Sequence, residues 1–173
     1  YPFITEKYTT EIITIAQAKE WLEMDIDGYE GRNDLIESAV KSAISSVETE
    51  CNFQLGVSTY TWNTPCVPYK FTDTFYITEI VSIKADGVML DANTYSTIKT
   101  SKRNTCISWS TLPAEAVNYE VIFKAGIVTV EPDLLQAIRA RVGECFVNRG
   151  DGVSEKRTLS DKLLQPYVIP YAG

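Results

Sequence analysis

The residues with the most evident capacity for chemistry are carboxylates, and they are concentrated in the first third of the chain. The 173 residues include 23 Asp and Glu against 16 Lys and Arg, a net charge of −7, and no His. Residues 1–60 hold 11 acidic and 4 basic side chains, so this segment accounts for the whole excess. Two interpretations follow: a solvated helical face, or a surface that repels nucleic acid or meets a basic partner. The candidate face is Glu20, Glu23, Asp25, Asp27 and Glu30.

Arrangements for catalysis or metal binding fail on residue type or spacing. With Asp25 as position 1 of a calcium loop, position 6 is Glu30 rather than Gly, and position 12 is Ile36 rather than Glu. The absence of His excludes Ser-His-Asp, Cys-His and HExxH sites. No nucleotide-phosphate loop occurs, and Glu48 and Glu50 are expected on different faces of a helix. We therefore expect no enzyme, metal site or cofactor, with an unrecognised carboxylate enzyme as the alternative.

Aromatic and basic residues in the middle of the chain allow a second set of functional hypotheses. The aromatic residues of the expected strands would suit a sugar-binding or base-stacking platform, but packing in a sheet core explains them better. A basic cluster could touch a phosphate or an acidic partner, or simply form an exposed hairpin tip. The aromatic residues are Tyr60, Trp62, Tyr95, Trp109 and Tyr119, and the basic cluster is Lys99, Lys102 and Arg103.

The cysteines indicate a reducing compartment. Cys51, Cys66, Cys106 and Cys145 form no CxxC motif, so metal and redox spacings are absent. We expect free thiols rather than disulfides, as in a protein made in the cytoplasm. No signal peptide is expected, because no basic segment precedes an apolar run near the start. We also expect no membrane span.

Hydrophobic periodicity predicts an α+β fold. Thr14 opens a short helix with a capping box to Gln17, and Asn33 or Asp34 begins a long helix that ends at Gly56. Residues 57–125 have a β texture, with about six short strands and a hairpin at Asp86-Gly87. The strand at 80–85 should place Val81, Ile83 and Ala85 on one face.

Pro132 begins a third helix, and residues 158–167 form a last short one, capped by Thr158 or Ser160. We therefore expect a small helical bundle of three main helices plus a short C-terminal helix, with an antiparallel β-sheet or small barrel inserted between the second and third helices. The expected single domain, 1–173, has a helical core at 14–56 and 127–150, a β insertion at 57–126 and a C-terminal tail at 151–173.

The C-terminal tail is apolar and carries two cations. Two interpretations remain open: the tail packs on its own core, or it inserts into a neighbouring subunit or partner. The candidate docking residues are Lys156, Arg157, Leu163, Leu164, Tyr167, Ile169 and Tyr171.

Three stretches together resemble the head–tail connector family (adaptor, or head-completion proteins) of tailed bacteriophages. Residues 14–25 follow the pattern Thr-x-x-x-Ala-Lys-x-x-Leu-x-x-Asp of that family's first helix. Residues 34–55 are similar to its long second helix. Residues 119–126, 132–138 and 146–149 are similar to its last strand, its Ala-Gly turn and its third helix. The β insertion is longer than in the compact members of the family.

The resemblance implies a non-enzymatic virion protein of the neck, at the head–tail interface. Such a protein forms a homo-oligomeric ring, typically a dodecamer, that binds the portal protein, extends the DNA channel and joins the head to the next neck or tail protein. It would act in genome packaging and ejection, with transient, non-specific passage of double-stranded DNA. The alternatives are another neck or tail protein (stopper or tail terminator) and a carbohydrate-binding module.

Within that role, two surfaces become specific hypotheses. The acidic face from Glu20 to Glu30 would line the lumen or meet a basic partner, because acidic walls reduce attraction to phosphate. The tail from Lys156 to Tyr171 would dock on the portal, since an apolar segment with a few cations suits insertion into a groove.

Overall fold

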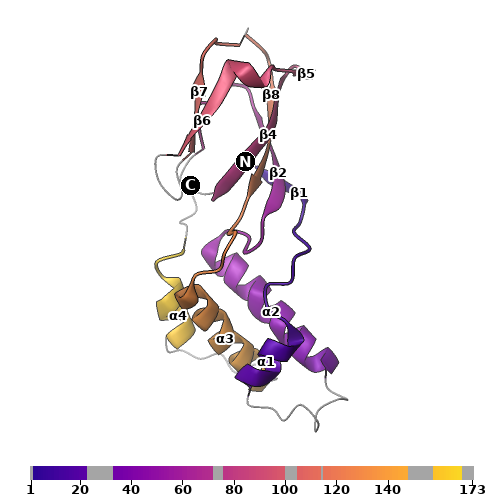
Figure 1. The fold of residues 1–173 in the computed structure, drawn as a ribbon, viewed down its shortest axis with the longest axis vertical. Helices are drawn as coiled ribbons and strands as arrows, with labels where there is room; N and C mark the ends of the chain where they lie inside the picture. The colour runs from indigo at the N-terminus through magenta and orange to yellow at the C-terminus, as the bar shows by residue number, and fades with distance from the viewer. Residues whose placement is uncertain are drawn as a thin grey trace. The chain divides into compact units, whose positions relative to one another are not determined.

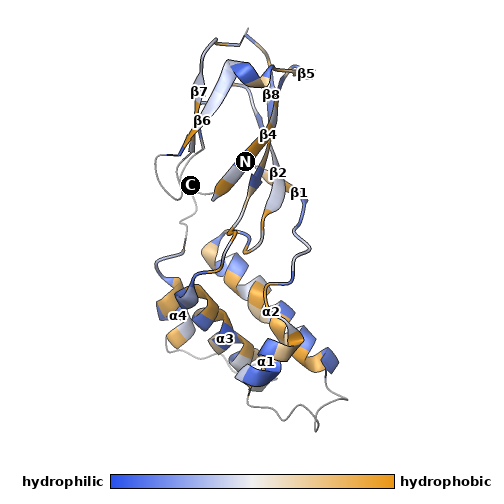
Figure 2. Ribbon diagram, viewed as in Figure 1, coloured by the Kyte–Doolittle hydropathy of each residue, from blue (hydrophilic) through white to orange (hydrophobic). Residues whose placement is uncertain are grey.

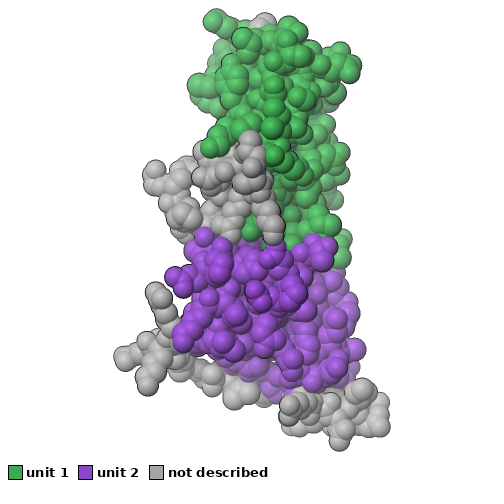
Figure 3. Space-filling view, turned by 60° about the vertical axis from the view of Figure 1, so that its left-hand side comes forward, with its two compact units in different colours: residues 1–10, 56–128 green, residues 11–55, 129–173 purple. Residues whose placement is uncertain are grey.

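The computed structural model describes residues 2–22, 33–71, 76–99, 105–113, 115–147 and 158–168. The chain divides into two compact units, each built from two separate stretches of sequence. Unit 1 comprises residues 1–10 and 56–128, and unit 2 comprises residues 11–55 and 129–173 (Figure 3). Unit 1 contains strands and unit 2 contains helices (Figure 1), so the α+β class expected from the sequence is confirmed.

The helices of unit 2 are α1 (Ile15–Trp21), α2 (Asn33–Cys51), α3 (Pro132–Val147) and α4 (Leu159–Leu164). The predicted capping box at the start of α1 is present. The amide of Gln17 donates to Thr14 Oγ1 at 3.2 Å, and the amide of Thr14 donates to Gln17 Oε1 at 2.9 Å. Pro132 stands at the first position of α3, as predicted, where its missing N–H leaves no bond unmade.

The predicted apolar stripe of α2 forms the buried side of that helix. Its buried residues recur every three to four positions, and the ribbon alternates between apolar and polar faces (Figure 2). The helix nevertheless ends at Cys51, so the predicted end at Gly56 is wrong. Asn52 adopts a left-handed conformation with φ 57°, a helix-ending geometry that Asn tolerates better than most residues. The buried residues are Ile36, Ala39, Val40, Ala43, Val47, Glu48 and Cys51.

Unit 1 contains two antiparallel sheets in the described residues, rather than one sheet or a small barrel of about six strands. The five-stranded sheet has the order β1-β2-β8-β4-β5, and the three-stranded sheet has the order β3-β7-β6. A short 3-10 turn at Ala92–Thr94 precedes β6. The strand bounds are β1 (Phe3–Glu6), β2 (Ser58–Thr64), β3 (Lys70–Phe71), β4 (Ile77–Ala85), β5 (Val88–Met89), β6 (Tyr95–Lys99), β7 (Thr105–Trp109) and β8 (Tyr119–Ala125).

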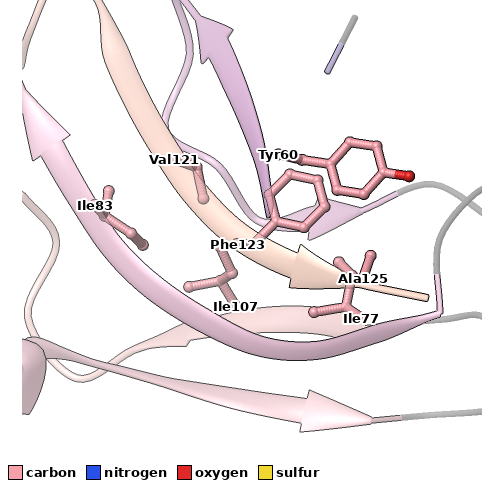
Figure 4. Close-up of a cluster of buried hydrophobic side chains, with 7 residues drawn as sticks. All are labelled: Tyr60, Ile77, Ile83, Ile107, Val121, Phe123 and Ala125. Carbon is pink, nitrogen blue, oxygen red and sulfur yellow. The ribbon is translucent and has the colours of Figure 1, made fainter. Parts of the chain in front are cut away.

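Strand β8 is the centre of the five-stranded sheet and supplies much of the core of unit 1. As predicted, Tyr119, Val121 and Phe123 share its buried face. The Phe123 ring stacks on Tyr60 of β2 with centroids 5.4 Å apart, and Ile107 of β7 joins the same cluster from the other sheet (Figure 4). The alternation of β8 therefore brings both sheets onto one apolar core.

Strand β4 breaks the simple alternation predicted for it. Its register with β8 shifts between Ile80 and Ser82, which marks a bulge. Ile80 and Ile83 both pack on the core, whereas Val81 is exposed, so the predicted common face of Val81 and Ile83 is wrong. The extra residue of a bulge reverses the facing of the positions on either side of it.

Candidate docking surfaces

Helix α4 is held on unit 2 by burial and by specific hydrogen bonds. Leu164 is fully buried and Tyr167, just beyond the helix, is buried. The Tyr167 hydroxyl donates to Glu131 Oε2 at 2.8 Å, and the buried Ser160 hydroxyl donates to the carbonyl of Ala137 at 3.2 Å. These contacts fix the described part of the candidate docking tail to α3 and the residue preceding it.

Arg141 of α3 joins three helices through its guanidinium group. Its Nη2 donates to Glu50 Oε2 of α2 at 2.7 Å and to Asp161 Oδ1 of α4 at 2.9 Å, and its Nε donates to Ser160 Oγ at 3.2 Å. The Arg141 side chain is only 18% exposed, so these charge-assisted bonds are partly shielded from water. This Arg141 cluster was not predicted from the sequence, although Thr158-x-x-Asp161 carries a capping signature.

The electrostatics of Asp161 follow from its place at the start of α4. The amide of Thr158 donates to Asp161 Oδ2 at 2.8 Å, and Thr158 is the N-cap of the helix, one of the two caps predicted. This backbone hydrogen bond is the main reason that the pKa of Asp161 lies below its usual range, and the nearby Arg141 lowers it further. Partial burial opposes both effects.

The candidate docking residues of the tail therefore divide into three groups. Leu164 and Tyr167 are buried in their own unit, which matches the first of the two interpretations left open by the sequence. Leu163 is half-buried. Lys156, Arg157, Ile169 and Tyr171 lie outside the described residues.

The acidic excess coincides with one of the two units. Unit 2 contains 16 acidic and 9 basic residues, and unit 1 contains seven of each, so the whole net charge of −7 belongs to unit 2. Glu20 is exposed on α1. Glu23, Asp25, Asp27 and Glu30 lie outside the described residues, as does the rejected calcium loop.

Carboxylates of α2 have structural partners rather than a shared site. Glu48 is buried, and its Oε1 accepts from the amide of Leu55 at 3.0 Å, whereas Glu50 pairs with Arg141. The two side chains therefore have different partners, Leu55 and Arg141. Within the described ranges, no group of three or more Cys, Asp or Glu residues is placed to hold a metal ion.

All four cysteines are described, and all are free thiols, as expected. Cys51 is fully buried at the end of α2, and Cys66 is exposed after β2. Burial raises the pKa of the Cys145 thiol, with Glu144 adding to the rise and Arg141 opposing it. The net effect of this environment is to disfavour the thiolate form of Cys145.

The aromatic residues of unit 1 pack on the sheet core, as the sequence favoured. Tyr60 and Tyr119 are buried, and Trp62, Tyr95 and Trp109 are partly buried against the core cluster. Trp109 Nε1 donates to the carbonyl of Pro68 at 2.9 Å, and the Tyr95 and Trp109 rings lie 5.5 Å apart. The rings are therefore used as packing rather than as an open stacking platform.

The basic cluster is described only in part. Lys99 is exposed at the end of β6, where its Nζ donates to the carbonyl of Thr78 at 3.5 Å. Lys102 and Arg103 lie outside the described residues.

Exposed apolar residues at the two edges of the five-stranded sheet were missed by the sequence reasoning. Phe3 and Ile4 are exposed on β1, and Val88 and Met89 are exposed on β5. For β5, the sequence signal of exposure was an apolar run directly after the Asp86-Gly87 turn. A strand this short is not covered on both sides. None of the described helices is long and apolar enough to cross a membrane.

Comparison with known proteins identifies the fold but not a sequence family. No protein-family model matches the sequence, and no curated protein matches it. Among solved structures, a chain from the neck of an empty gene transfer agent (GTA) particle, computed with C6 symmetry, has a TM-score of 0.74 at 14% identity, covering 100% of this chain and 98% of that one. A chain of the native GTA virion gives 0.72 at 14% identity, covering 98% and 99%. A chain from the native GTA neck, computed with C12 symmetry, gives 0.68 at 14% identity with the same coverage.

Proposed function

We propose that this chain is a structural, non-enzymatic protein of the neck of a phage-like virion. More specifically, it is an adaptor: a ring of twelve copies beneath the portal protein that extends the DNA channel and connects the head to the next neck or tail protein. The observation that carries the proposal is the agreement of the whole fold, 98–100% of both chains, with chains from GTA neck particles. The adaptor-like sequence stretches at 14–25, 34–55 and 119–149 support the same position.

The separation of charge between the units supports a channel protein. DNA that must pass through a ring should not be bound tightly, and acidic side chains weaken attraction to phosphate. We assign the acidic face, with Glu20 as its described member and Glu23, Asp25, Asp27 and Glu30 beyond it, to the lumen or to a basic neighbour. Charge reversal at Asp25 and Asp27 should then impair assembly or DNA delivery, and unchanged infectivity would contradict the assignment.

The tail remains our proposed portal-docking segment, with a division of roles among its residues. Leu164 and Tyr167 anchor it to unit 2, so deletion of 158–173 would open the helical core and would not test docking. A chain shortened after Val168, and a separate K156E/R157E variant, leave the anchors in place. Both should fold normally and attach to portal-bearing heads less well than the full chain, and normal attachment of both would overturn this role.

Electron-microscopy images of the purified chain, alone and with portal, test the proposed function. Closed rings with a central hole that bind the portal support the adaptor. Rings or monomers that bind heads only after another neck protein has been added would indicate a stopper, and binding to tails alone would indicate a tail terminator. A chain that joins no part of the particle and binds a carbohydrate would replace the proposal with the remaining alternative.

A further inference from the structure

We propose that neighbouring copies of this chain are held together through unit 1, by contact between the two edges of its five-stranded sheet. The exposed apolar side chains of β1 in one copy meet the β4–β5 hairpin of the next copy. This inference rests on the proposed function, because its occupant is a second copy of the chain in a ring.

The hairpin edge presents a rigid apolar tip. Asp86 and Gly87 both have positive φ, 46° and 83°, which is the geometry of a tight hairpin turn. The Asp86 carboxylate also accepts from the amides of Val117 at 3.2 Å and Asn118 at 2.9 Å, which fixes the segment before β8 beside the turn. Val88 is 69% exposed and Val117 is 84% exposed. A preformed apolar tip loses little conformational entropy when it binds.

The other edge of the same sheet is also apolar and exposed. Phe3 pairs with Thr61 and Ile4 with Tyr60 across to β2, while the outer side of β1 has no strand beside it in the described fold. Phe3 is 52% exposed. A register shift between Ile4 and Glu6 interrupts the ladder, so we assign the contact to side chains rather than to a continuous sheet between copies.

Two different edges on one sheet provide what a ring requires. A ring of identical copies uses a heterologous interface, in which one patch of each copy binds a different patch of the next. Strands β1 and β5 are the two ends of a single hydrogen-bonded sheet, so each copy carries both patches in a fixed relation. Strand β6 is an edge of the other, three-stranded sheet, so a contact through it would not use the two ends of one sheet.

The distribution of charge also favours contact through unit 1. Each unit 2 contains seven more acidic than basic residues, so copies brought together through unit 2 repel one another. Unit 1 has equal numbers of acidic and basic residues and adds no net repulsion. The neutral unit is therefore the one that can supply adhesion between copies.

The test uses one glutamate on each edge, Phe3→Glu and Val88→Glu, in the full chain. Both positions are exposed, so circular dichroism and thermal unfolding should match the wild type. Association of each variant with itself should weaken about a hundredfold, as expected when a central apolar contact is replaced by a charge. Leu112→Glu is the matched control, an exposed apolar position of unit 1 outside both edges, and Ile98→Glu tests the competing edge at β6.

Mixing the two edge variants gives the sharpest readout. A Phe3→Glu copy retains an intact hairpin edge, and a Val88→Glu copy retains an intact β1 edge. These two intact edges form one junction, and the edges left at the ends of the pair are both mutated. Native mass spectrometry should therefore show dimers and no larger assembly. If the wild type forms rings and either edge variant alone also forms rings, this inference is wrong and the proposed function still stands. Disruption by Ile98→Glu instead would also overturn it. A wild-type chain that stays monomeric at every concentration and beside portal would overturn both.

Discussion

The two units of this protein use different physics to hold their elements together. Unit 2 packs helices and links three of them through the partly buried guanidinium of Arg141, with carboxylates from α2 and α4 around it. Unit 1 packs its two sheets on a shared apolar core, in which Ile107 of the three-stranded sheet meets residues of the five-stranded sheet, including the stacked rings of Tyr60 and Phe123. Its ion pairs, the half-buried Lys84–Glu120 and the exposed Lys124–Glu79, run between the neighbouring strands β4 and β8.

In the proposed ring, this contrast would let an acidic chain associate with copies of itself. Unit 2 carries the net charge of −7, whereas unit 1 has no net charge. Unit 1 also has the exposed apolar strand edges. Repulsion of DNA and adhesion between copies are then assigned to different parts of the chain. The following predictions test this contrast, from the largest expected effect to the smallest.

Loss of the Phe123 ring should produce the largest change in stability. Phe123→Ala removes a fully buried ring from the centre of unit 1 and should lower the free energy of unfolding by about 3–5 kcal/mol, measured by urea denaturation. Phe3→Ala, at an exposed position of the same unit, is the control and should change it by less than about 1 kcal/mol. Equal losses in the two variants would show that the stacked core is not what stabilises unit 1.

Removal of the Arg141 guanidinium should weaken unit 2. Arg141→Met retains the apolar length of the side chain but leaves Glu50 and Asp161 without their cation, at a cost of about 1–3 kcal/mol. Amide hydrogen exchange should rise mainly in α4. Arg139→Met is the exposed control on the same helix, and a loss as large in that variant would exclude a special role for the cluster.

Acid should weaken the attachment of α4 through Asp161. Hydrogen bonds with Thr158 and the charge of Arg141 lower the pKa of this carboxyl in the folded state. Its contribution to the free energy of unfolding is therefore complete above the unfolded pKa of about 4, and it is lost as the pH falls through the lower folded pKa. Unfolding measured between neutral pH and strong acid should therefore show a steeper loss in the wild type than in Asp161→Asn. Parallel profiles would contradict the assignment.

Thiol labelling should give the smallest and most local signal. Cys66 is exposed and should react with a maleimide in the native protein, whereas Cys51 is fully buried in unit 2 and should react only when that unit opens. In Arg141→Met, labelling of Cys51 should become faster while labelling of Cys66 stays the same. Rapid labelling of Cys51 in the native wild type would contradict the described packing of α2.

Features with a local cause were predictable from the sequence. The Thr14–Gln17 capping box, Pro132 at the start of α3, the α2 stripe and the alternation of β8 each depend on neighbouring residues and one dominant period. The hairpin at Asp86-Gly87 was also predictable, because both residues tolerate positive φ.

Features that depend on distant partners were not predictable in this way. The bulge near Val81 is defined against β8, about 40 residues away, and it reverses a face that simple alternation had assigned. The Arg141 cluster joins Glu50 to Asp161 across more than 100 residues. Gly126 approaches the backbone of Gly56 so closely that a Cβ would lie 2.2 Å from its carbonyl oxygen, a constraint that only the folded unit reveals.

The most direct measurement of the central claim is an electron-microscopy reconstruction of this chain assembled with a portal protein. The account predicts a closed ring in which neighbouring copies touch through unit 1, with β1 of one copy against the β4–β5 hairpin of the next, and with the acidic side chains of unit 2 facing the channel or a basic neighbour. A ring whose copies contact one another only through unit 2, with unit 1 free of its neighbours, would contradict it.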